Sequence, residues 1–151
     1  MQARMDHPAV TLPGTMKALL ALGETAKEGG LPDSLLELAN LRASQINGCS
    51  VCVDMHAKAL RKAGESDERI FAVGAWRDAP FYSEAERAAL ALAEAVTRLA
   101  DRSDGVPDEV WRVAAEHFDE RQLSALLVAV ATVNTWNRLN AATRQVAGAW
   151  G

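Results

Sequence analysis

Alanine supplies 29 of the 151 residues, and this abundance constrains the fold more than any other feature of the chain. Alanine has the highest intrinsic helix propensity of the amino acids. Aromatic residues, which favour strands, make up only 5% of the chain. Few segments alternate apolar and polar residues with a period of two, whereas apolar residues recur at helical spacing in most of the chain. The sequence therefore predicts an all-α fold.

Turn and capping signals divide the chain into six or seven helices. Gly29-Gly30 ends the first helix, and Asn47-Gly48 marks a turn directly before Cys49. Asp119 followed by Gln122 has the spacing of a helix-capping pair. The expected helices cover residues 15–27, 33–46, 49–62, 66–73, 83–100, 107–117 and 120–146.

The segments between these helices are too short to be domain linkers. Residues 1–151 are therefore expected to form one compact, bundle-like domain, of which residues 1–13 are a loose N-terminal arm. No motif spacing links His7 or His117 to another candidate residue, so both are expected at the surface.

Charge and hydropathy weigh against several classes of partner. The formal net charge is −4, which does not suit a nucleic-acid-binding surface. Apolar runs fall short of the roughly 18 residues that span a bilayer. The N-terminal segment MQARMDHPAV lacks the apolar stretch of a secretory signal. We therefore expect a cytoplasmic protein that binds neither nucleic acid nor membranes.

The two cysteines, Cys49 and Cys52, lie three residues apart and are too few for the disulfide framework of a secreted mini-protein. Because the cytoplasm keeps most thiols reduced, such a pair favours redox chemistry or metal binding. His56 follows Cys52 by four residues, which places both on one helix face. Glu37 lies on the preceding helix and would be partly buried if the two helices are antiparallel. These four residues are the candidate active site.

The residues leave several interpretations of this group open. Cys49 lies near a helix N-terminus, which favours a thiolate there. Cys52 has His56 as a neighbouring base, and on this ground we favour Cys52 as the attacking thiol. Alternatively, the two cysteines and His56 could hold zinc, with Glu37 or water as the fourth ligand. The plainest alternative is that the cysteines are small buried hydrophobes.

The spacing of Glu37, Cys49, Cys52 and His56 resembles the signature of the alkyl hydroperoxidase D-like proteins, in the carboxymuconolactone decarboxylase superfamily. The resemblance extends from about residue 35 to residue 147, and its other matching segments are residues 42–44, Asn47, residues 54–55 and residues 133–140. It implies the compact helical fold of that family.

The resemblance also implies a thiol peroxidase that acts on organic hydroperoxides without a cofactor or metal. By position, Cys52 would be the peroxidatic cysteine, Cys49 the resolving cysteine, and Glu37 with His56 a proton relay. An external dithiol, carried by a lipoyl-bearing or thioredoxin-like protein, would reduce the disulfide. Family members often form trimers or hexamers. The best-known members carry a histidine where this chain has Val51, which implies a shorter relay and weaker peroxidase activity.

The sequence is also compatible with two other functions. One is a decarboxylase-type reaction of the same superfamily, although the decarboxylases resemble this fold without the cysteine pair. The other is a redox-sensing or assembly protein whose disulfide alters oligomer contacts. Separately, the polar residues Asn134, Asn137 and Arg138 interrupt an apolar helix. Three alternative roles follow for these residues: they satisfy buried polar groups, they line a site, or they mark a subunit interface.

Overall fold

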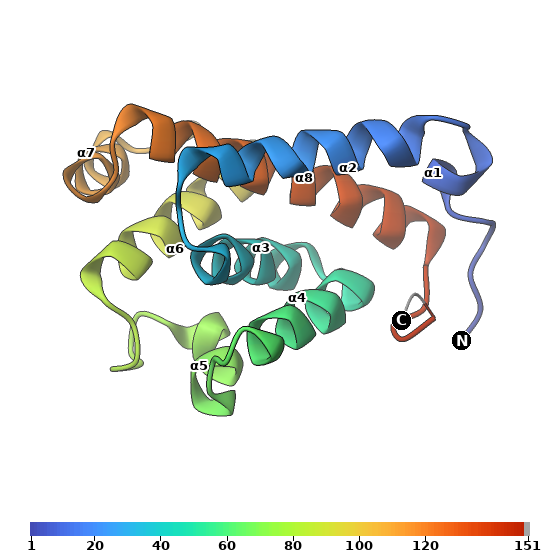
Figure 1. The fold of residues 1–151 in the computed structure, drawn as a ribbon, viewed down its shortest axis with the longest axis horizontal. Helices are drawn as coiled ribbons and strands as arrows, with labels where there is room; N and C mark the ends of the chain where they lie inside the picture. Colours follow the sequence, from blue (N-terminus) through green and yellow to red (C-terminus); the bar gives the residue numbers. More distant parts are fainter. Residues whose placement is uncertain (150–151) are drawn as a thin grey trace.

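The computed structural model describes residues 1–149, which form a layered bundle of helices (Figure 1). The α-helices are α1 (Pro8–Thr11), α2 (Thr15–Thr25), α3 (Asp33–Asn47), α4 (Ser50–Lys62), α5 (Asp67–Ala72), α6 (Glu84–Thr97), α7 (Asp108–His117) and α8 (Glu120–Thr143). Short 3-10 turns follow at Ala26–Gly29, Val73–Ala75 and Leu99–Asp101. The described part of the chain contains no strand, so the all-α prediction is confirmed.

Helices α2 to α8 correspond to the seven expected helices, and their ends show why the boundaries differ. Asp119 and Gln122 form the reciprocal capping box that opens α8. The sequence predicts that this helix continues to about Val146, but Arg144 adopts a left-handed conformation with φ of 54° and ends it at Thr143. The backbone N–H of Arg144 donates to the carbonyls of Ala141 and Asn140, so the helix closes in a left-handed C-cap.

The N-terminal segment differs from the loose arm that the sequence predicts. One turn of helix, α1, forms in it, and the His7 side chain accepts a hydrogen bond from the backbone N–H of Ala9. Arg4 N–H donates to the Thr143 carbonyl at 2.8 Å, which ties the arm to the end of α8. His7 is 3% exposed, so its predicted surface position is wrong; His117 is exposed as expected.

Helix α3 is the centre of the bundle and packs against α4, α6 and α8. Small residues allow this close approach, because Ala39 on α3 and Ala89 and Ala93 on α6 are completely buried. One apolar core lies between α3, α6, α7 and α8, and a second lies between α3, α4, α5 and α6. Helix α2 lies across α8 (Figure 1). The site described below is enclosed by α2, α3, α4 and α8.

A buried carboxylate links α3 to α6. The Glu94 side chain is 3% exposed and accepts hydrogen bonds from Arg42 Nε at 2.7 Å and Trp76 Nε1 at 3.0 Å, while Arg77 Nη1 lies 2.7 Å from its second oxygen. Burial alone would raise the pKa of Glu94, but the hydrogen bonds from Trp76, Arg77 and Arg42 outweigh it and lower the pKa. A carboxylate with a lowered pKa stabilises the fold at neutral pH, and this contribution is lost as the pH falls through that pKa.

Replacing Glu94 with Gln should lower the free energy of unfolding by about 3 kcal/mol at pH 7, because Arg42 then lacks a charged partner. The difference from the unmodified protein should shrink as the pH falls below the ordinary glutamate pKa of 4.5. Urea unfolding at several pH values, followed by circular dichroism, measures both the loss of stability at pH 7 and its decrease in acid. Glu109→Gln, which removes an exposed pair with Arg112, is the control and should leave the midpoint unchanged. Equal urea midpoints for the unmodified protein, Glu94→Gln and Glu109→Gln would contradict the stabilising role of the Glu94 carboxylate.

Candidate active site

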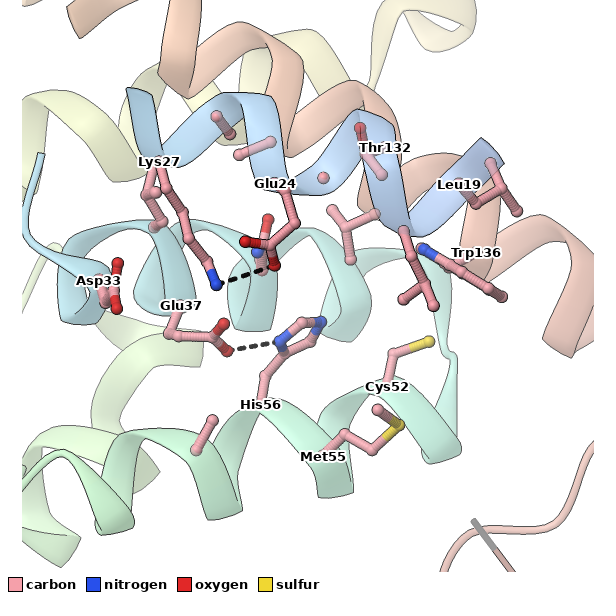
Figure 2. A pocket seen from close by; sticks show the side chains of 18 of the residues that line it. Leu19, Glu24, Lys27, Asp33, Glu37, Cys52, Met55, His56, Thr132 and Trp136 are labelled. Carbon is pink, nitrogen blue, oxygen red and sulfur yellow. Dashed lines mark hydrogen bonds and ion pairs between the residues drawn. The ribbon is translucent and has the colours of Figure 1, made fainter. Parts of the chain in front are cut away.

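A tight turn between α3 and α4 brings the predicted residues together. Gly48 ends α3 with φ of 67°, a left-handed conformation that glycine adopts without strain, and Cys49 is the N-cap of α4. The two helices therefore lie side by side, and Glu37 on α3 meets His56 on α4. Glu37 Oε2 lies 2.7 Å from His56 Nδ1 (Figure 2). Glu37 is partly buried, as expected.

Cys49 and Cys52 form a disulfide in this structure, with their Cα atoms 5.4 Å apart. Both residues are buried, at 2% and 4% exposure, and Trp136 of α8 packs against them. The N–H of Cys52 donates to Cys49 Sγ at 3.3 Å, and Asn140 Nδ2 donates to Cys52 Sγ at 3.4 Å. The sulfurs therefore sit among hydrogen-bond donors in an otherwise apolar environment.

A cavity of about 680 Å³ lies between α2, α3, α4 and α8, and Cys52 and His56 line it (Figure 2). Its polar end holds the Glu37–His56 pair and the Lys27–Glu24 ion pair, whose charged atoms are 2.9 Å apart. The remaining wall is mainly apolar and includes Met16, Leu19, Leu20, Met55, Ala129, Val133 and Trp136. In Figure 2 the ring of His56 presents its second nitrogen to this cavity, away from Glu37. The cavity suits a partly apolar molecule with one polar, reactive end.

Asn40 is a site residue that the motif spacing does not reveal. It lies on α3 one turn after Glu37 and lines the same cavity. Its Oδ1 atom is buried and has no hydrogen-bond partner. A buried acceptor without a partner costs about 1–3 kcal/mol, which makes it a natural contact for a ligand that donates a hydrogen bond. The i, i+3 spacing from Glu37 is the sequence signal that could have identified it.

A network of side-chain amides holds the turn in place. Asn47, the last residue of α3, donates to Asn134 Oδ1 at 2.9 Å and to Asn137 Oδ1 at 2.8 Å, both on α8. Asn137 Nδ2 in turn donates to Ser44 Oγ at 3.0 Å. Arg138 donates to the carbonyl and side-chain oxygens of Asn134. Of the alternatives for these polar residues, satisfying buried groups within the chain is the one the structure supports.

The structure thus brings Glu37, Cys52 and His56 to one cavity, whereas Cys49 lines a second cavity and not this one. Within residues 1–149, no group of three or more His, Cys, Asp or Glu side chains is placed to hold a metal ion, so the zinc alternative has no geometric support. His7 also lines the cavity, and its ring centroid lies 5.6 Å from that of Trp136. No described helix is both long and apolar enough to cross a bilayer.

Comparison with known proteins places this helical arrangement in a family. The sequence model of the Carboxymuconolactone decarboxylase family matches residues 13–95. The uncharacterized protein YdfG of Bacillus subtilis is 38% identical over 142 residues, which cover 94% of this chain and 95% of YdfG. The chain therefore belongs to the carboxymuconolactone decarboxylase family.

Within that family the chain is AhpD-like. An alkyl hydroperoxide reductase AhpD from Solibacter usitatus is 44% identical over 59 residues, which cover 39% of this chain and 33% of that protein. The solved structure of an Agrobacterium tumefaciens protein of unknown function, named as a candidate antioxidant defence protein AhpD, superposes with a TM-score of 0.90 at 37% identity and covers 97% of this chain and 98% of that one. The debrominase Bmp8, at 22% identity and a TM-score of 0.81 over 93% of this chain and 74% of its own, shares the fold.

Asn137→Leu should lower the free energy of unfolding by about 2 kcal/mol, because it removes one of the two acceptors of the Asn47 amide and the donor to the buried Ser44 hydroxyl. Thermal and urea unfolding measure the loss. Thr135→Leu, at an exposed position of the same helix, is the matched control and should change little. Equal free energies of unfolding for Asn137→Leu and Thr135→Leu would contradict the stabilising role of the amide network.

Proposed function

We propose that this protein is a thiol peroxidase that reduces organic hydroperoxides through a Cys49/Cys52 dithiol–disulfide cycle. The observation that carries the proposal is the shared cavity, in which the Cys52 sulfur and the Glu37–His56 pair face the same apolar space. The family and the AhpD-like relatives support the same reaction class.

The first step oxidises Cys52. Glu37 accepts the Nδ1–H of His56 and thereby leaves the other ring nitrogen free to take the proton of the Cys52 thiol. The thiolate attacks the terminal oxygen of the hydroperoxide, and the O–O bond breaks. The departing alkoxide takes the proton from His56 and leaves as the alcohol, so Cys52 becomes a sulfenic acid.

The second step forms the disulfide. The Cys49 thiol, at the N-cap of α4, loses its proton and attacks the sulfur of the Cys52 sulfenic acid; the S–O bond breaks, and the departing hydroxide takes up that proton and leaves as water. The two thiols have together supplied the two electrons that reduce the peroxide. An external dithiol must return these electrons, because the chain has no third cysteine.

In the first step, Asn40 Oδ1 would accept a hydrogen bond from the O–H of the hydroperoxide and so orient it.

Stopped-flow measurement of peroxide reduction tests the assigned roles. Cys52→Ser should abolish the oxidation step, and Cys49→Ser should leave a sulfenic acid at Cys52 that dimedone traps. His56→Asn should slow oxidation about a hundredfold through loss of the base. Glu37→Gln should slow it about tenfold through loss of orientation. His117→Asn, at an exposed position on α7, is the matched control. Peroxide turnover that survives Cys52→Ser would refute the proposal.

Asn40→Leu separates a ligand contact from a structural one. The variant should lower kcat/KM for an organic hydroperoxide about tenfold, which corresponds to one lost hydrogen bond of about 1.4 kcal/mol. Its midpoint of urea unfolding should be equal or higher, because an unpartnered buried oxygen is replaced by an apolar group. Lower stability together with unchanged kcat/KM would show that Asn40 serves the fold instead.

The oligomeric state, the cellular location and the reductant of the proposed enzyme are further predictions. We expect a homo-oligomer, as a trimer or hexamer, that works in the cytoplasm with a dithiol carried by a lipoyl-bearing or thioredoxin-like protein. Sedimentation of the reduced and oxidised protein measures the assembly. The same measurement separates a redox-controlled assembly from the peroxidase, because only the former requires a change in size on oxidation.

A further inference from the structure

The two cysteines of the disulfide line different cavities. A second cavity, of about 310 Å³, lies beside the α3–α4 turn and the end of α8, and Cys49 lines it. Cys52 lines only the larger cavity, and Cys49 only the smaller one. Val51 and Asn140 line both cavities and therefore form the partition between them.

The smaller cavity is suited to a negatively charged ligand. Arg144 is the one charged side chain among the described residues that line it, and it is exposed at the end of α8. The N-terminus of α4, a helix of 13 residues, begins at this cavity with Cys49 and Ser50. The unpaired N–H groups at a helix N-terminus carry a partial positive charge. A thiolate that approaches Cys49 would meet the N-terminus of α4 and Arg144, whose charge also offsets the partial negative charge at the C-terminal end of α8.

We propose that the smaller cavity is the site where the external dithiol attacks, and that its thiolate attacks the Cys49 sulfur. This inference rests on the proposed dithiol–disulfide cycle. The incoming thiolate bonds to Cys49 Sγ, the bond between the two cysteines breaks, and Cys52 leaves as a thiolate. The second thiol of the reductant, as its thiolate, then attacks the reductant's own sulfur in the mixed disulfide. Cys49 departs as a thiolate, and the reductant leaves as a disulfide.

The geometry of thiol–disulfide exchange favours this direction of approach. The attacking sulfur must approach in line with the bond that breaks, from the side opposite the leaving sulfur. Attack on Cys49 therefore requires access from the side away from Cys52, and the smaller cavity lies beside Cys49. The released Cys52 thiolate then faces the larger cavity beside His56, where the next hydroperoxide binds. Substrate and reductant thus use separate openings.

Of the two dithiol carriers that the family resemblance implies, the smaller cavity suits the slender dithiol of an extended arm better than the surface of a folded protein. Cys49 is 2% exposed, so a cysteine pair on the surface of a folded protein would not reach its sulfur. A narrow aliphatic dithiol fits a space of about 310 Å³. Dihydrolipoamide is a suitable probe of this class.

Reduction of the isolated disulfide tests the inference without any peroxide. The protein is oxidised with diamide and mixed with dihydrolipoamide, and free thiols are counted by alkylation and mass spectrometry. Ala141→Trp, which narrows the smaller cavity, should slow reduction at least tenfold. Ala131→Trp, at an exposed position of the same helix that lines neither cavity, is the matched control and should react at the original rate.

Two further variants keep the inference falsifiable. Arg144→Gln should slow reduction and weaken its dependence on ionic strength, because the charge that attracts the thiolate is gone. Leu19→Trp narrows the larger cavity. The inference is overturned if Leu19→Trp slows reduction more than Ala141→Trp does, or if Ala141→Trp reacts at the original rate. Failure of the peroxidase proposal would appear differently, as a reduced protein that hydroperoxide does not oxidise.

Discussion

The side-chain amide of Asn47 is the interaction on which the arrangement of the site depends. It joins the last turn of α3 to Asn134 and Asn137 on α8, at distances below 3 Å. The next residue, Gly48, turns the chain and Cys49 begins α4, so the network fixes where both cysteines lie. The position of α4 then sets the distance between His56 and Glu37. Acid–base geometry and disulfide geometry thus share one structural origin.

Close packing of alanine-rich helices explains why the cavities lie where they do. Ala39, Ala89 and Ala93 let α3 and α6 approach each other closely in the core. On the other side of α3, longer side chains from α2, α4 and α8 surround the cavity at Cys52 and His56 instead of filling it. The same bundle therefore combines a tightly packed half that gives stability with an open half that admits a ligand.

Local sequence signals predicted the features that depend on neighbouring residues, namely the helices and the spacing of the candidate site residues. Helix propensity and caps located α2 to α8, and the spacing of Glu37, Cys49, Cys52 and His56 anticipated the Glu37–His56 contact between neighbouring helices and the closeness of the two cysteines. Features that arise from contacts distant in sequence were missed or left open. His7 is buried because the arm folds back toward α8, and the unpartnered oxygen of Asn40 becomes visible only once the cavity around it is known. The burial of His7 depends on contacts with residues distant in sequence, and the spacing of Asn40 from Glu37 indicates its position but not its unpartnered oxygen.

The most direct test of the central claim is a titration of the fully reduced protein with an organic hydroperoxide. Free thiols and the alcohol product are counted at each addition. The account predicts that each equivalent of hydroperoxide yields one equivalent of alcohol and removes two thiols, with Cys49 and Cys52 linked in the product. Thiols that survive while the hydroperoxide remains unconsumed would contradict it.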